Sequence, residues 1–111
     1  DNKALKRAVD YGYLNIVKFL SELPNVCLSA ENDYAIYAAS KNGYVEIVDF
    51  LCRKNVNFST ENNKPLKSAV REGYLNVVKV LCSYIKTFDE NVLKIAKKYK
   101  QFEILEFLKK F

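Results

Sequence analysis

The sequence contains no histidine, no tryptophan and no methionine, and it has only three glycines and two prolines among its 111 residues. Without histidine, the common Cys/His zinc sites are excluded, and three scattered cysteines cannot supply four ligands. There is also no G-x-S-x-G nucleophile motif and no glycine-rich phosphate-binding loop. We therefore predict a protein that is not an enzyme and that carries no metal or cofactor.

Long apolar runs are absent as well, since none approaches the roughly 18–20 residues that span a bilayer. The opening residues, DNKAL, show neither a basic segment nor an apolar one, so we expect no secretory signal. The three cysteines form an odd set without a C-x-x-C pair, which is typical of a reduced chain. These features predict an intracellular, cytoplasmic protein that does not bind membranes.

The net charge of +5 comes from fifteen lysines and three arginines against thirteen acidic residues. Lysine is typical of a solvated surface, whereas arginine is better suited to bidentate recognition of phosphates and base edges. A basic group near the C-terminus consists of Lys94, Lys97, Lys98, Lys100, Lys109 and Lys110. It allows two interpretations, a nucleic-acid patch or a solvated end face. Glu103 and Glu106 dilute this group, which favours the end face.

One phrase occurs three times in the sequence. It reads GYLNIVKFL at 12–20, GYVEIVDFL at 43–51 and GYLNVVKVL at 73–81, and an alanine lies four residues before each glycine. A fourth copy, AKKYKQFEILEFL at 96–108, has Lys100 in the place of glycine. A period of about thirty residues indicates stacked structural units that share one continuous core, because one unit alone cannot bury its apolar face.

Each copy contains two segments of helical length. In the second segment of the second copy, Val45, Val48 and Leu51 recur at helical spacing. The predicted fold is all-α, a single domain over 1–111 with repeats at approximately 1–30, 31–60, 61–88 and 89–111. We expect first helices at 3–11, 34–42, 64–72 and 91–99, and second helices at 13–21, 44–53, 74–84 and 101–110.

The repeated glycines fall between the two helices of a unit, where a residue with positive φ commonly ends a helix. Small residues such as Ala39 and Ala69 would let the first helices approach their neighbours closely. Short polar side chains precede the first helices and could accept hydrogen bonds from their first N–H groups: Asn2, Asn32 or Asp33, Asn63 and Asp89. The acidic pairs Glu31 with Asp33 and Asp89 with Glu90 could also serve acid–base chemistry, but helix capping explains them better.

These residues resemble the ankyrin repeat family, whose pattern is close to T-P-L-H-x-A-A, two variable residues, then G-H-L-E-V-V-K-L-L. KPLKSAVREGYLNVVKVL at 64–81 matches best, and YAIYAASKNGYVEIVDFL at 34–51 and KALKRAVDYGYLNIVKFL at 3–20 follow the same spacing. The resemblance implies a solenoid of about four ankyrin-type helix-turn-helix repeats. It also implies a protein–protein interaction module, which we expect to be monomeric.

The chain departs from the family pattern at several positions. The glycines are 31 and 30 residues apart rather than the family's usual 33, which predicts short or trimmed hairpin loops, and the family's G-A-D-V-N turn survives only as NVNFS at 55–59. This short, Asn- and Tyr-rich variety is similar to ankyrin proteins of giant viruses that infect amoebae, which implies a viral protein in the host cytoplasm. The family's threonine is replaced by Lys3, Tyr34 and Lys64, and its first histidine by Lys6, Tyr37 and Lys67. The histidine after glycine is replaced by Tyr13, Tyr44 and Tyr74, which we expect to be half-buried.

The fourth copy carries Lys97 where the others have Val9, Ser40 and Val70. A repeat array needs a polar outer face on its last unit, so we expect a terminal or near-terminal repeat here. Its second helix keeps apolar residues for packing, at Phe102, Ile104, Leu105, Phe107 and Leu108. The first copy lacks such a polar face, which predicts further repeats before Asp1.

Cys52 and Cys82 occupy equivalent positions in adjacent repeats. Neighbouring helices lie roughly 10 Å apart, whereas a disulfide requires Cα atoms within about 7 Å. We therefore interpret both residues as buried packing thiols, and we expect Cys27 to pack as well.

The resemblance places partner binding on the concave face, formed by the turn before each first helix and the exposed end of that helix. By alignment, the predicted contacts to an unidentified partner protein, such as a host protein, are Asp10, Tyr11, Glu31, Asp33, Lys41, Asn42, Glu61, Asn63, Arg71 and Glu72. Two alternatives remain open: a basic nucleic-acid-binding module, and a structural or self-associating spacer.

Overall fold

The computed structural model describes residues 3–28, 30–54, 60–85 and 87–111, with only the backbone for 30–32 and 60–62. Within these ranges the chain forms eight helices and no strand. In order they are α1 (Lys3–Asp10), α2 (Leu14–Ser21), α3 (Ala30–Asn42), α4 (Val45–Arg53), α5 (Thr60–Glu72), α6 (Leu75–Tyr84), α7 (Asn91–Lys98) and α8 (Phe102–Lys110). The predicted helices are therefore confirmed, except that α3 and α5 begin four residues earlier than expected.

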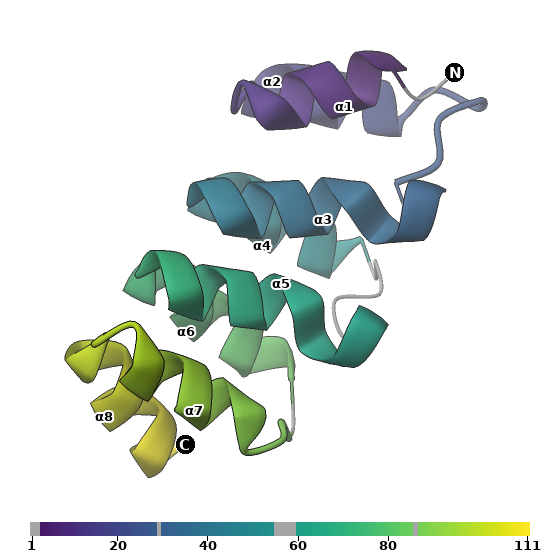
Figure 1. The fold of residues 1–111 in the computed structure, drawn as a ribbon. Coiled ribbons are helices and arrows are strands. Elements are labelled where there is room, and N and C mark those ends of the chain that lie inside the picture. Colours follow the sequence, from purple (N-terminus) through teal and green to yellow (C-terminus); the bar gives the residue numbers. More distant parts are fainter. Residues whose placement is uncertain (1–2, 29, 55–59, 86) are drawn as a thin grey trace.

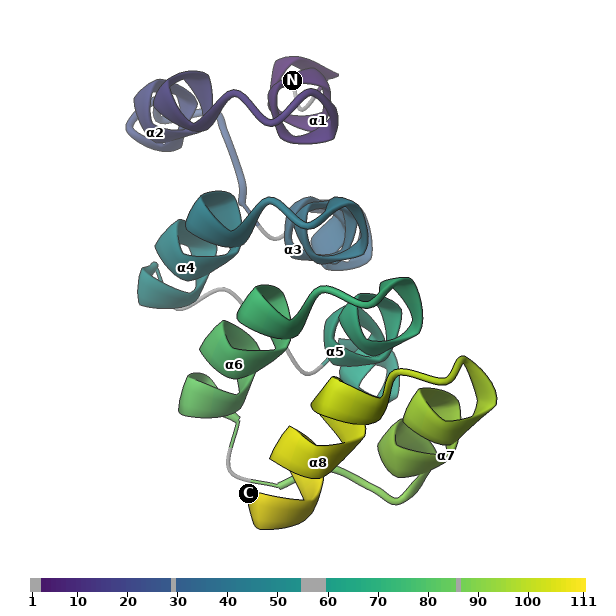
Figure 2. The same cartoon turned by 90° about the vertical axis from the view of Figure 1, so that its left-hand side faces the viewer.

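The helices pair in chain order and stack into an elongated body of 41 × 22 × 19 Å. Figure 1 shows α1, α3, α5 and α7 one below another, and Figure 2 shows that α2, α4, α6 and α8 make a second layer beside them. Each helix of a layer contacts the next helix of that layer. This arrangement is the predicted all-α solenoid, and we call its two layers the first-helix layer and the second-helix layer.

The spacing from alanine to glycine is explained by the hydrogen bonds at each corner between two paired helices. The N–H of Tyr44 donates to the carbonyl oxygen of Ala39 at 2.9 Å, and the N–H of Gly43 donates to that of Ser40 at 3.4 Å. Gly43 itself has a φ of 78°. This is the pattern of a Schellman helix end, in which the residue after glycine bonds back five positions. The same back-bonds end α1, α5 and α7.

Each corner also fits against the repeat that follows. A Cβ atom on Gly12 would lie 2.9 Å from Cε1 of Tyr44, so only glycine leaves room for the ring there. The Tyr44 hydroxyl donates to the carbonyl oxygen of Asp10 at 3.1 Å. Tyr74 covers Gly43 in the same way, which confirms the prediction that these two tyrosines are half-buried. For Tyr13 that prediction is wrong, because this ring at the outer end of the stack is exposed.

The core is one continuous cluster that runs through all four helix pairs. Its members at the helix contacts are small, such as Ala39 and Ala69, while Ile47, Leu51 and Leu81 fill the space between the layers. Cys52 and Cys82 belong to this cluster and are free thiols, as predicted. Two packing predictions are wrong: Cys27 is exposed, and Phe102 keeps 63% of its surface exposed because it lies on the outward side of α8.

The beginnings of α3 and α5 differ from the predicted caps. Asp33 and Asn63 lie in the fourth position of these helices, with φ of 60° and 64°, instead of preceding them. Asp and Asn tolerate this left-handed conformation better than most residues. Regular helix therefore resumes after Asn63, which places Pro65 in a first turn where its missing N–H is harmless. Asn2 and the turn at 55–59 lie outside the described residues.

The last helix pair differs from the others at several positions. Lys97 is exposed, whereas the equivalent Val9 and Val70 are completely buried. Lys100 adopts a φ of 58° in the place of glycine. At the start of α7, the N–H of Asn91 donates to Oδ1 of Asp89 at 3.0 Å, so Asp89 does act at this helix start.

Candidate functional site

The predicted contact residues fall into two sets at opposite ends of the first helices. The set near the glycine corners is exposed, and Tyr11 keeps 68% of its surface exposed. It contains Asp10, Tyr11, Lys41, Asn42, Arg71 and Glu72. Asp10 is also part of the stack, since its Oδ1 accepts a hydrogen bond from the Tyr34 hydroxyl at 2.8 Å.

The second set lies in the first turns of α3 and α5. Asp33 is only 7% exposed, so the prediction that its side chain is on the surface is wrong. The cause is its left-handed backbone, which turns the carboxylate inward and leaves Oδ1 buried without a hydrogen bond; Oδ1 of Asn63 is buried in the same way. The side chains of Glu31 and Glu61 lie outside the described residues. The two sets do not form one patch, because most of a helix separates them.

Between these two ends, a groove runs across the first-helix layer. With a volume of about 320 Å³, it crosses α3, α5 and α7 and is lined by Tyr37, Lys64, Lys67, Ser68, Arg71, Ile95, Lys98 and Tyr99. We call it the first-helix groove. Only Arg71 was predicted from the sequence as a contact residue. The groove therefore joins three consecutive repeats on one surface.

Lysine ammonium groups lie over tyrosine rings along this layer. Nζ of Lys64 is 4.3 Å from the centre of the Tyr37 ring, and Nζ of Lys98 is 5.5 Å from that of Tyr99. Such cation–π contacts hold the long side chains against the surface while the charge stays accessible to water. Lys67 is additionally 3.7 Å from Oδ2 of Asp89. The groove therefore presents ordered positive charges.

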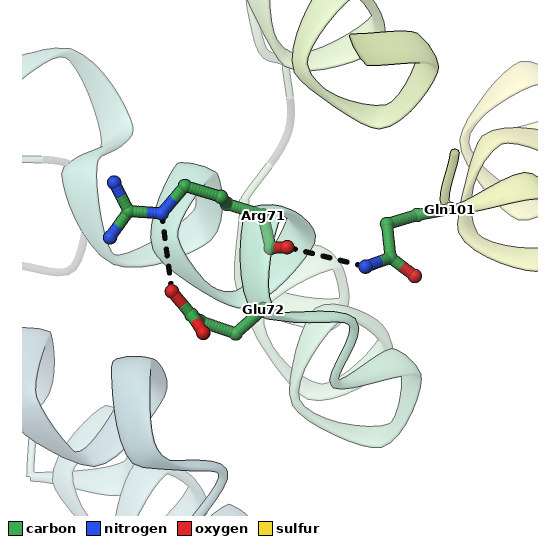
Figure 3. Close-up of polar contacts among 3 residues, drawn as sticks. All are labelled: Arg71, Glu72 and Gln101. Carbon is green, nitrogen blue, oxygen red and sulfur yellow. Dashed lines mark hydrogen bonds and ion pairs between the residues drawn. The ribbon is translucent and has the colours of Figure 1, made fainter. Parts of the chain in front are cut away.

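Arg71 lines the groove, and Figure 3 shows its polar contacts with Glu72 and Gln101. Its Nε donates to Oε2 of Glu72 at 3.2 Å, and its backbone carbonyl oxygen accepts a hydrogen bond from Nε2 of Gln101 at 3.2 Å. Gln101 occupies the position that Tyr44 and Tyr74 have in earlier repeats, and it lies over Gly73 in their manner. The corner that carries Arg71 and Glu72 is thus held by the last repeat.

The lysines and tyrosines of the groove were not predicted as contacts, because Tyr37, Lys64 and Lys67 were noted only as replacements in the family pattern and Lys98 was assigned to a basic end face. A signal was nevertheless present in the sequence. The family's threonine and first histidine are replaced by lysine or tyrosine in the first three repeats, and Lys64, Tyr37 and Lys67 are among these replacements. These replacements recur at fixed repeat positions on the first helices. Stacking of the repeats therefore aligns them along one face.

The buried thiols are poorly suited to chemistry. Burial raises the pKa of Cys52 to about 12, with the nearby Asp49 carboxylate adding to the rise, and burial alone raises the pKa of Cys82 to about 11. Since the thiolate is the nucleophilic form, both residues are inert at neutral pH. The described residues include no group of three or more side chains suited to binding a metal ion. None of the helices in that part of the chain has the length and apolar character needed to cross a membrane.

Comparison with known families gives the same architecture. Residues 5–92 match the pattern of ankyrin repeats, in three copies. The chain belongs to the ankyrin repeat family. Members of this family are generally protein–protein interaction modules and are typically not enzymes. In this ankyrin repeat protein, the matched segment covers the first three helix pairs and the beginning of α7. No curated protein matches the sequence.

Proposed function

We propose that this ankyrin repeat protein is a non-catalytic module that binds a partner protein through its first-helix layer. The observation that carries this proposal is the first-helix groove, which crosses three repeats and is lined mainly by polar and charged side chains. These side chains project from helices whose opposite sides are buried in the core. They are therefore available for binding without disturbing the fold.

The stack favours binding because it orders this surface in advance. Association costs about 0.5–1.5 kcal/mol for each rotamer-rich side chain that must be immobilised. Here cation–π contacts and the ion pair of Arg71 with Glu72 already restrict several of these side chains. The array would act as a single unit. Its two buried free thiols favour an intracellular, reducing environment for this function. The resemblance of the Asn- and Tyr-rich repeats to ankyrin proteins of amoeba viruses, which we draw from the sequence alone, extends the proposal to a host protein as the partner.

Affinity capture tests the proposal. The immobilised protein is incubated with cell lysate, and the captured proteins are compared between the wild type and a variant carrying Tyr37→Ala, Arg71→Ala and Glu72→Ala. A matched control carries Lys18→Ala and Asn76→Ala, which are exposed on the second-helix layer. We expect proteins that are lost with the first variant and retained with the control. Equal capture by both variants, with helical content preserved, would contradict the proposal.

A further inference from the structure

We infer that the first-helix groove binds an acidic, extended peptide segment of a partner protein, an inference that depends on the proposed binding face. The central feature is a stripe of cations on α5. Lys64, Lys67 and Arg71 follow a spacing of i, i+3 and i+7, which brings all three onto one side of the helix. At 1.5 Å per residue, this stripe is about 10 Å long.

The walls of the groove add to this positive field. Lys98 of α7 lines it with Lys64, Lys67 and Arg71, while Asp89 pairs with Lys67 and Glu72 pairs with Arg71. Glu72 occupies only Nε of Arg71, and within the described part of the chain the terminal nitrogens of Arg71 make no hydrogen bond or ion pair. A guanidinium fork is suited to a carboxylate, which it can bind through two parallel hydrogen bonds.

The dimensions of the stripe fit a peptide strand. In an extended chain, alternate residues lie on one side and are about 6.6–6.8 Å apart. A stripe of about 10 Å therefore matches two or three acidic side chains at alternate positions of a short segment. The half-buried Ile95 and the buried Ser68 line the groove between the charges and leave room for the peptide backbone.

Nucleic acid fits the groove less well, because lysine side chains already cover the tyrosine rings of the groove. Sequence-tolerant binding of single strands depends on exposed aromatic faces on which bases stack. Here the ammonium group of Lys64 lies over Tyr37, and that of Lys98 lies over Tyr99. Asp89 pairs with Lys67 in the middle of the stripe and Glu72 pairs with Arg71, so a continuous phosphate backbone would be repelled at both places, whereas a peptide can place its few carboxylates away from them.

A fluorescence anisotropy titration tests this inference with a labelled peptide of alternating glutamate and serine. The matched control peptide has glutamine at every glutamate position, and labelled oligothymidine serves as the nucleic-acid probe. We expect the glutamate peptide to bind and the other two probes to bind at least about tenfold more weakly. Lys64→Gln with Lys98→Gln should weaken peptide binding by roughly tenfold, whereas Lys18→Gln on α2 should not change it. Binding should also weaken as salt is added.

Three results would overturn the inference. They are equal binding of the glutamate and glutamine peptides, no effect of Lys64→Gln with Lys98→Gln, and oligothymidine binding that is tighter than peptide binding and depends on Lys64 and Lys98. Affinity capture separates this failure from that of the proposed function. If capture from lysate still depends on Tyr37, Arg71 and Glu72 while the acidic peptide does not bind, only the acidic specificity is wrong. If neither depends on the groove, both proposals are wrong.

Discussion

Ile16 and Ile47 occupy the same position in two successive repeats, yet 46% of Ile16 is exposed and only 1% of Ile47. Ile47 follows Tyr44 by three positions, and the Tyr44 ring lies over Gly12 of the first repeat, whereas Tyr13 and Ile16 belong to the first described helix pair of the stack. The burial of a residue in this protein therefore depends on the neighbouring unit as much as on its own helix.

This difference predicts unequal effects of one substitution. Ile47→Ala should lower the free energy of unfolding by about 2–4 kcal/mol, because it leaves a cavity in the core. Ile16→Ala should lower it by less than about 1 kcal/mol, since much of that side chain already contacts water. Urea unfolding followed by circular dichroism measures both values. Equal losses would show that the two positions are not equivalent in the stack.

The contact between Gly43 and Tyr74 predicts a strong effect at the corner of the second repeat. A Cβ atom on Gly43 would lie 2.7 Å from Cε1 of Tyr74, and the backbone there has a φ of 78°. Gly43→Val should destabilise the protein by about 2–4 kcal/mol, through backbone strain and overpacking together. The neighbouring exposed Asn42→Ala is the control and should change the unfolding midpoint little. A neutral result for Gly43→Val would contradict the corner geometry.

The corner of the last repeat predicts a stabilising substitution. Lys100 adopts a φ of 58°, a conformation that costs a residue with a Cβ atom about 1–2 kcal/mol. Lys100→Gly should therefore raise the free energy of unfolding by about 1 kcal/mol. Lys97→Gly, inside α7, should instead lower it by about 1 kcal/mol, because glycine weakens a helix interior. Thermal unfolding of the two variants should shift the midpoint in opposite directions.

The buried thiols predict a loss of stability in alkaline solution. The pKa values of Cys52 and Cys82 rise from 9.0 to about 12 and about 11, so the folded state keeps protons that the unfolded chain releases. Stability from this source is fully present below pH 9, and it falls as the pH rises from about 9 toward 11, by up to about 1.4 kcal/mol per pH unit for each thiol. Urea titrations at several pH values measure the slope. A variant with Cys52→Val and Cys82→Val should lack this part of the slope, and an identical slope would refute the linkage.

Much of the fold was predictable because the same residue pattern recurs in each repeat and specifies the same local structure. The alanine–glycine–tyrosine spacing placed the corners correctly, and it also identified Lys100 as the residue that replaces glycine. The failures occur where burial depends on partners that periodicity does not specify. Tyr13 and Phe102 are exposed because they lie on outward surfaces of the end units. Asp33 was expected to precede α3 as a helix cap, because its side chain is short and polar. It lies instead inside the first turn of α3 with a left-handed backbone, which buries the side chain.

The binding face was harder to predict than the fold. Variable polar residues at the helix ends were chosen by alignment, and they proved to be divided between two ends of the first-helix layer. Lys64 and Tyr37 belong to different repeats and are 27 positions apart in sequence, so their contact follows only from how the repeats stack. Reading the same motif position across all repeats, instead of each residue alone, would have brought lysines and tyrosines together.

The pairing of a glycine corner with the aromatic ring of the next unit has a consequence for how the molecule can change in length. Gly12 meets Tyr44, and Gly43 meets Tyr74, through the same two residue types. A duplicated segment of 43–72 spliced in after residue 72 would begin with a glycine and a tyrosine, so it would fit both its predecessor and its successor. Growth by copying requires no compensating change elsewhere, so gene duplication can extend this surface one step at a time.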